Sequence, residues 1–119
     1  MNQHETINYL EFPARDMAAT KTFFNTVFNW QFVDYGPEYI AIDGAGIDGG
    51  FYLTDVCSTQ ATGSVLVVFY SESLDETQKK VEQAGGAIVR EKFGFPGGHR
   101  FHFSDPNGNE FAVWSDKEL

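Results

Sequence analysis

The chain has 119 residues, a length typical of one domain, and its 17 acidic against 8 basic side chains give a net charge of −9. The 42% hydrophobic composition with 12 phenylalanines excludes a disordered chain. The acidic balance argues against nucleic acid or an anionic membrane as a partner, because both favour a basic surface. The longest apolar run, 65–70, is far short of the roughly 20 residues of a membrane span. With a single cysteine, Cys57, and no signal-peptide pattern, we expect a soluble cytoplasmic protein.

The first half of the chain predicts a strand, a helix and three further strands. Residues 6–12 alternate in hydrophobicity, and Pro13 is expected to end that strand. Asp16 is a favourable N-cap for a helix that runs to about Asn29 and has apolar residues at helical spacing. Three short strands follow, at residues 31–35, 39–43 and 50–54.

The second half repeats this order. A strand rich in β-branched and aromatic residues spans 64–70, and Ser73 with Glu76 forms a capping box for a helix that ends at Gly85. Three strands follow, at residues 87–92, 100–104 and 110–115. The repeat predicts an α+β fold of two βαβββ modules, about 5–56 and 63–116, within one domain spanning 1–119. Neither half can bury its sheet alone, so the two are expected to pack together.

Three motifs have ligand-binding spacing but the wrong structural context. Residues 44–49 match G-x-G-x-x-G, but a strand follows instead of a helix, which favours a hairpin connection. Residues 105–116 resemble a calcium loop, but a tight turn is favoured because the flanks are strand-like. His99 and His102 are three apart on a strand, so their side chains point to opposite faces and cannot easily bind one metal. Cys57 has no adjacent histidine and is interpreted as an inert thiol.

The order and spacing of several short segments resemble the vicinal oxygen chelate superfamily, which includes glyoxalase I, bleomycin- and fosfomycin-resistance proteins and extradiol dioxygenases. The resemblance covers nearly the whole chain. The matching segments are residues 7–13, Asp16 with 18–24, 27–30, 84–86 and above all Phe103-Ser104-Asp105-Pro106-Asn107-Gly108-Asn109-Glu110. The resemblance implies that the two modules form an eight-stranded curved mixed sheet, a cup with the helices on its outer side and ligands bound inside.

The resemblance also implies where a divalent metal would bind, because active members usually place His or Glu on four strands. The corresponding positions here are Tyr9, Gly50, Val65 or Leu66, and Ala112. Neutral tyrosine is rare as a ligand and the other side chains have no donor atom, whereas a divalent ion needs three or four suitable donors. We therefore expect no metal and predict no cofactor.

Polar and aromatic side chains are expected to line the cup instead. Strand alternation places Glu11 beside Tyr9 on one face, and it places Glu110 on the same face as Trp114. Phe101 and Phe103 suit the core side, which turns Arg100 and His102 toward the cup. A carboxylate, a guanidinium and an imidazole in an aromatic cavity can orient a small polar ligand. Alternatively, Glu11 and Arg100 or His102 simply neutralise one another, as buried charges generally must. The predicted ligand-binding residues are Tyr9, Glu11, Tyr52, Arg100, His102 and Trp114.

Three functions remain open from the sequence. The first is a metal-free binding protein of the glyoxalase/bleomycin-resistance type that holds a small, partly aromatic or carbonyl-bearing molecule. The second is a glyoxalase-related lyase or isomerase for a small carbonyl compound, with Glu11 as base and His102 as acid, or with an unrecognised metal site. The third is a structural or regulatory domain whose cup is filled by aromatic side chains.

The segment 92–98 is rich in glycine and contains a proline, and it carries Phe93 and Phe95. This composition predicts an apolar loop, which usually marks a contact surface or a lid over a pocket. Two-fold dimers are the commonest closed assemblies and the superfamily commonly forms them. We therefore expect a homodimer.

Overall fold

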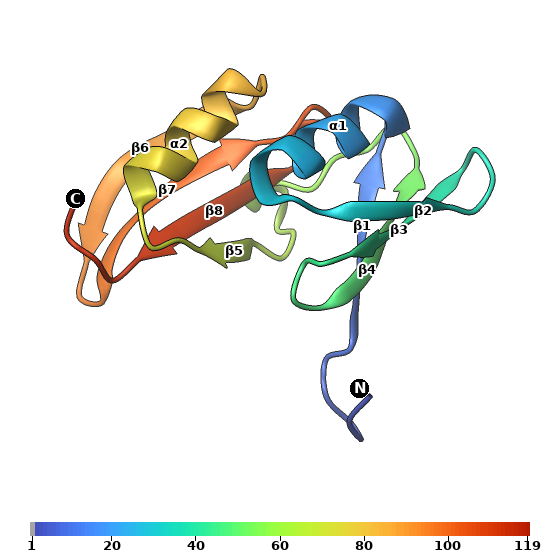
Figure 1. Cartoon of the computed structure of the whole chain (residues 1–119), viewed down its shortest axis with the longest axis horizontal. Coiled ribbons are helices and arrows are strands. Elements are labelled where there is room, and N and C mark those ends of the chain that lie inside the picture. The colour runs from blue at the N-terminus through green and yellow to red at the C-terminus, as the bar shows by residue number, and fades with distance from the viewer. Residues whose placement is uncertain (1) are drawn as a thin grey trace. The chain divides into compact units, whose positions relative to one another are not determined.

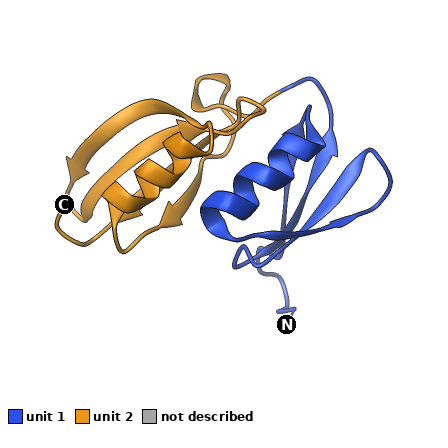
Figure 2. Ribbon diagram, turned by 45° about the horizontal axis from the view of Figure 1, so that its top comes forward, with its two compact units in different colours: residues 1–56 blue, residues 57–119 orange. Residues whose placement is uncertain are grey.

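The computed structural model describes residues 2–119, which fold into two modules with the same order of elements (Figure 1). The chain divides into two units, Met1–Val56 and Cys57–Leu119, each with one α-helix on a four-stranded mixed sheet (Figure 2). The predicted α+β class and the two βαβββ modules are confirmed. No helix within residues 2–119 is both long and apolar enough to cross a membrane.

Unit 1 contains β1 (Tyr9–Ala14), α1 (Met17–Phe28), β2 (Gln31–Asp34), β3 (Tyr39–Asp43) and β4 (Asp48–Leu53). The strand order is β1-β4-β3-β2, with β1 parallel to β4 and the other neighbours antiparallel. The helix begins as predicted, because an Asp16 carboxylate oxygen accepts a hydrogen bond from the Ala19 N–H at 3.0 Å. It ends at Asn29, whose φ of 59° lies in the left-handed region.

An aromatic cluster fills the space between α1 and the sheet of unit 1. Phe24 stacks on Trp30 with ring centroids 4.5 Å apart, and its centroid lies 5.4 Å from that of Phe51. All three side chains are buried, and burial of each phenylalanine contributes about 1.5–3 kcal/mol. Because strand side chains alternate, this packing turns the other set of strand residues to the face away from α1.

Unit 2 contains a 3-10 helix η1 (Gln60–Thr62), then β5 (Val67–Tyr70), α2 (Leu74–Gln83), β6 (Ala87–Phe95), β7 (Gly98–Ser104) and β8 (Glu110–Ser115). The strand order is β5-β8-β7-β6, with β5 parallel to β8. Phe101 and Phe103 are fully buried, and Phe103 stacks on Phe111 at 5.5 Å between centroids. This arrangement confirms the predicted faces of β7 and β8.

A buried turn joins β7 to β8. The Asp105 carboxylate accepts hydrogen bonds from the backbone N–H groups of Asn107 and Asn109, both at 2.9 Å. Gly108 has a φ of +88°, which a residue with a side chain rarely adopts. The acidic and amide groups of the calcium-like spacing therefore stabilise a tight turn, as the sequence favoured.

Several predicted boundaries differ from the structure. β1 begins at Tyr9 instead of residue 6. Pro13 does not end β1, which continues to Ala14; β1 is an edge strand, where a residue without an N–H is tolerated. The segment 92–98 is not a free loop, because β6 continues to Phe95 and Phe93 pairs with Arg100 in β7. Register shifts along β6 accommodate its extra residues. The segment that suggested a dimer contact therefore belongs to the β6–β7 hairpin, and the homodimer stays a prediction.

Two further details of unit 2 differ from the expectation. The strand β5 begins at Val67 instead of residue 64. Ser73 precedes α2 as predicted, but its side chain makes no capping hydrogen bond. Instead, the Ser71 hydroxyl accepts from the Ser73 N–H at 3.0 Å and bonds the Thr77 hydroxyl at 2.7 Å. A serine two residues earlier therefore takes the place of the capping box.

Candidate functional site

The predicted site residues lie on the face of each sheet opposite its helix, which we call the open face. In unit 1, the strand register places Glu11 opposite Gly50, and Tyr39 opposite Tyr52. The open face of unit 2 carries Tyr70, Arg90, Phe93, Arg100, His102, Glu110, Ala112 and Trp114. Each unit thus brings its own predicted residues together on one surface.

On the open face of unit 1, Tyr39 links the predicted residues. Its hydroxyl donates a hydrogen bond to Glu11 Oε2 at 3.0 Å and contacts the Tyr9 hydroxyl. The same hydroxyl fills the space above Gly50, because a Cβ at Gly50 would overlap with it. Burial, helped by the hydrogen bonds to Tyr9 and Glu11, raises the pKa of Tyr39, so its hydroxyl stays protonated and continues to donate. Tyr39 was not among the predicted site residues, and it shares the open face because it lies opposite Tyr52 in the register of β3 and β4.

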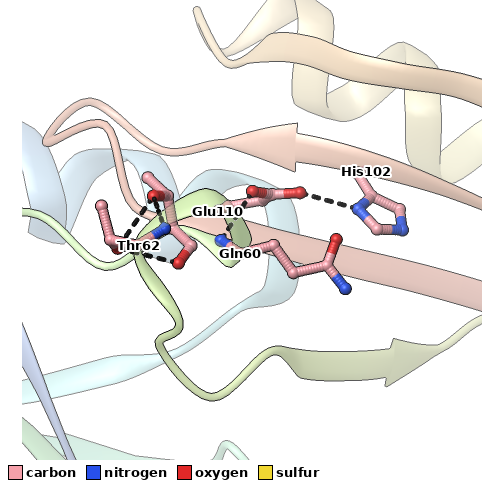
Figure 3. Close-up of polar contacts among 5 residues, drawn as sticks. Gln60, Thr62, His102 and Glu110 are labelled. Carbon is pink, nitrogen blue, oxygen red and sulfur yellow. Dashed lines mark hydrogen bonds and ion pairs between the residues drawn. The ribbon is translucent and has the colours of Figure 1, made fainter.

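On the open face of unit 2, His102 and Glu110 form a hydrogen-bonded pair. His102 is 1% exposed, and its Nδ1 lies 2.8 Å from Glu110 Oε2 (Figure 3). The second carboxylate oxygen, Oε1, accepts the backbone N–H of Gln60 at 3.0 Å. His102 pairs across the hairpin with Ala112, so Glu110 is its diagonal neighbour on the same face. The sequence placed both residues on this face but did not pair them.

This pairing determines which ring nitrogen carries the proton. Burial tends to raise the pKa of Glu110, but hydrogen bonds from His102 and from the Gln60 N–H outweigh it and lower the pKa. An ionised carboxylate only accepts hydrogen bonds, so Nδ1 of His102 is the protonated nitrogen. In the neutral ring, Nε2 then has a free lone pair. This buried nitrogen has no hydrogen-bond partner among the described residues.

Two arginines and aromatic rings surround the His102 ring. The ring of Phe93 lies 6.0 Å from that of His102 between centroids. The Arg90 guanidinium stacks over Phe93 at 3.7 Å from the ring centroid, and that of Arg100 lies at 5.3 Å. Arg100 pairs across the hairpin with Trp114, and its buried Nε has no partner among residues 2–119.

The residues present do not fit a divalent metal. Within residues 2–119, no three His, Cys, Asp or Glu side chains gather as a metal ion would require. Of the positions that the resemblance assigns to ligands, Gly50 lies under the Tyr39 side chain, Val65 precedes β5, and Ala112 is buried beside His102. Unit 2 instead offers two guanidinium groups, which donate hydrogen bonds to ligand oxygen atoms, and the Nε2 lone pair of His102, which accepts one from a ligand hydroxyl or N–H group.

A hollow of about 360 Å³ in unit 1 lies away from these groups. Its lining includes Gln3, Thr6, Asn8, Gly46, Ile47 and Asp48. None of the predicted site residues contributes to this hollow, and none of the buried unpartnered atoms found in residues 2–119 belongs to it. We therefore place the candidate site by its chemistry, on the open face of unit 2.

The comparisons with known proteins agree with this fold. A family model for the glyoxalase/bleomycin resistance protein/dioxygenase superfamily matches residues 6–113. A fosfomycin resistance protein from Listeria monocytogenes has a similar structure (TM-score 0.78, 17% identity, covering 98% of this chain and 97% of that one). So does a glyoxalase-related enzyme from Fulvimarina pelagi (TM-score 0.76, 18% identity, 93% and 88% covered). No curated protein sequence matches the chain. At such identities, the likeness shows the fold alone.

Proposed function

We propose that this chain, which belongs to the glyoxalase/bleomycin resistance protein/dioxygenase superfamily, binds a small molecule without using a metal ion. The proposed site is the open face of unit 2, and the central polar contact is Nε2 of His102. The donor set of this face supports the metal-free proposal, since it lacks the three or four ligands that a divalent ion needs.

The observation that carries this proposal is the buried, unpartnered Nε2 of His102. A buried polar atom without a hydrogen bond costs about 1–3 kcal/mol, and a ligand hydroxyl or N–H that donates to Nε2 removes that cost. The bond from Nδ1 to Glu110 holds the imidazole in one orientation before any ligand arrives. A preorganised contact of this kind loses little entropy on binding.

The aromatic side chains near Arg100 supply an apolar surface for the same ligand. Trp114 meets Tyr70 edge-on at 5.1 Å between ring centroids, and the ring of Phe95 lies 6.1 Å from Trp114. Flat rings beside a few convergent polar groups are typical of small-molecule sites. They favour a ligand that is partly aromatic or carries a carbonyl group.

Tyr9, Glu11 and Tyr52 stay proposed ligand contacts on the open face of unit 1. Tyr39 occupies Oε2 of Glu11, which leaves Oε1 as the oxygen that a ligand would use. The cytoplasmic location, the homodimer and the lack of nucleic-acid or membrane partners also remain proposals. Sedimentation equilibrium at micromolar concentration tests the dimer.

Native mass spectrometry of the protein purified without added metal or chelator tests the binding proposal. The wild-type protein should retain a small organic molecule, and His102→Gln should lose it. His99→Gln is the matched control, because His99 lies on the same strand with the opposite parity. Equal retention by both variants, or a stoichiometric transition metal on the open face of unit 2, would overturn the proposal.

A lyase or isomerase acting on a small carbonyl compound is the second candidate. The His102–Glu110 pair favours it, because Nε2 has a free lone pair in the neutral ring and can accept a proton from a substrate. Glu110 would stabilise the resulting imidazolium as a positioning residue. The sequence predicted Glu11 as base and His102 as acid, and that assignment stays a prediction; Glu11 accepts from Tyr39, and His102 pairs with Glu110.

Turnover of the methylglyoxal–glutathione hemithioacetal tests this second candidate. The reaction should survive a chelator and be lost in His102→Gln. Glu110→Gln should change the pH profile of kcat/KM, because it removes the charge that holds the Nδ1 proton. If a panel of α-ketoaldehyde adducts shows no turnover, the enzyme candidate is rejected and the binding proposal is unaffected.

A further inference from the structure

Arg90 and Arg100 lie on the open face of unit 2, and neither has an acidic partner there. Lys21 pairs with Asp34 at 3.1 Å, and Lys92 pairs with Asp75 at 2.6 Å. Neither arginine forms an ion pair with any carboxylate in the part of the chain that the structure describes. In a chain with 17 acidic and 8 basic side chains, two unpaired guanidinium groups on one face need an explanation.

The way in which the arginines pack leaves their hydrogen-bond donors available. A guanidinium stacked on an aromatic ring uses its flat face, and its N–H groups point outward in its plane. Arg90 lies over Phe93 in this way, and Arg100 is within cation–π distance of the same ring. The Nε of Arg100 is buried and has no partner among residues 2–119. The two cations are thus held in place with their donors unused.

We infer that the small molecule bound on this face carries a carboxylate group, which Arg100 and Arg90 hold. This inference rests on the function proposed above and names the class of ligand. Planar guanidinium groups match the two oxygens of a carboxylate and bind it through charge-assisted hydrogen bonds. The Glu110 carboxylate already accepts from His102 and from the Gln60 N–H, so it does not occupy either guanidinium group.

The position of Arg100 also orients the rest of the ligand. Trp114 is its cross-strand partner, and His102 is the next residue of β7 on the same face. A carboxylate bound at Arg100 therefore places an attached flat group along Trp114, and a hydroxyl or N–H on that group can donate a hydrogen bond to Nε2 of His102. The ligand class is a small monocarboxylate with an aromatic or carbonyl-bearing body.

An NMR titration with benzoate and its neutral analogue benzamide tests this inference. The readouts are the Nε–H resonance of Arg100 and the indole N–H of Trp114 in the ¹⁵N-labelled full chain. Benzoate should shift both resonances and bind about tenfold more tightly than benzamide, because only benzoate offers a charged acceptor. Arg90→Gln should weaken benzoate about tenfold and Arg100→Gln at least as much, with the Trp114 indole as the readout. Arg15→Gln in unit 1 is the matched control and should leave the affinity unchanged.

Three results would overturn the carboxylate inference. The first is equal affinity for benzoate and benzamide, which would reject the carboxylate but not the proposal that a ligand binds to the open face of unit 2. The second is unchanged benzoate affinity in Arg100→Gln. The third is the absence of any shift beyond that caused by sodium chloride at the same concentration. The co-purification experiment with His102→Gln decides separately whether the proposed function itself fails.

Discussion

The two units share one order of elements, but their open faces differ in how many polar groups have a hydrogen-bond partner within the protein. In unit 1, Tyr39 donates to Glu11 and fills the space above Gly50. In unit 2, His102 and Arg100 each keep a buried nitrogen without a partner among residues 2–119. A repeated fold therefore does not imply a repeated function, and the unpartnered groups point to unit 2.

The difference arises at two equivalent positions with small side chains. Gly50 in β4 and Ala112 in β8 both leave space on the open face of their sheet. A long tyrosine from the neighbouring strand fills that space in unit 1. In unit 2, the residue opposite Ala112 is His102, which Glu110 holds through Nδ1. In unit 1 the space above the small residue is filled by Tyr39, whereas unit 2 keeps a fixed imidazole whose Nε2 has no partner among residues 2–119.

The largest expected effect is a difference in stability between variants that each lack the carboxylate of one open face. Glu110→Ala leaves Nδ1 of His102 buried without a partner, so we expect it to lower the free energy of unfolding by about 2 kcal/mol. Glu11→Ala removes an exposed carboxylate and should cost about 0.5 kcal/mol or less. Urea unfolding of both variants provides the measurement. Equal losses of stability would contradict the contrast between the two faces.

Filling the space above Gly50 should have the next largest effect. Gly50→Ala places a Cβ where the Tyr39 hydroxyl lies, so we expect a loss of about 1–2 kcal/mol from overpacking. Tyr39→Ala should cost less in the Gly50→Ala background than in the wild-type protein, because the clash is then absent. A double-mutant cycle followed by urea unfolding measures this coupling. Strictly additive effects would show that Tyr39 does not close the face.

A smaller effect is expected in the pH dependence of stability, which should reveal the contribution of Glu110 on the open face of unit 2. The pKa of Glu110 is lower in the folded protein than in the unfolded chain, so the unfolded chain binds a proton at Glu110 more readily. The ionised pair with His102 therefore stabilises the protein at neutral pH. That contribution is lost as the pH falls below 4.5, the ordinary pKa of glutamate, through the lower folded value. Glu110→Gln should lose less stability than the wild-type protein over this range. Identical acid profiles from urea unfolding would refute the assignment.

Two other carboxyl groups with lowered pKa values also contribute to the loss of stability in acid. Hydrogen bonds with Lys92 and Tyr70 lower the pKa values of Asp75 and Asp116 respectively. Both groups are present in wild type and variant, so their contribution cancels in the difference. The remaining difference belongs to Glu110 and its partner.

The sequence predicted the faces of the strands better than the contacts on them. Alternation correctly turned Phe101 and Phe103 into the core, because a period of two follows from strand geometry alone. The pair of His102 with Glu110 depends on the register between two strands, and alternation within one strand does not contain that information. The Tyr39 contact depends on a side chain that reaches across to a neighbouring strand.

Local composition misled the prediction where tertiary structure decides. Glycine and proline in 92–98 are typical of a loop, but Phe93 and Gly94 pair with β7 and continue the strand. Pro13 normally ends a strand, but it is tolerated in β1 because that strand lies at the sheet edge. In both places, the position of a strand within its sheet outweighs the preference of single residues.

The ring nitrogens of the three histidines give the most direct test of the central claim that a ligand binds at Nε2 of His102. The measurement is a long-range ¹H–¹⁵N NMR spectrum of the protein as purified and after unfolding and refolding to release bound molecules. We predict that His102 keeps its proton on Nδ1 in both samples and that its Nε2 resonance moves on release, while His4 and His99 stay unchanged. An Nε2 resonance of His102 that is identical in the two samples, although mass spectrometry shows that a molecule was released, would contradict the account.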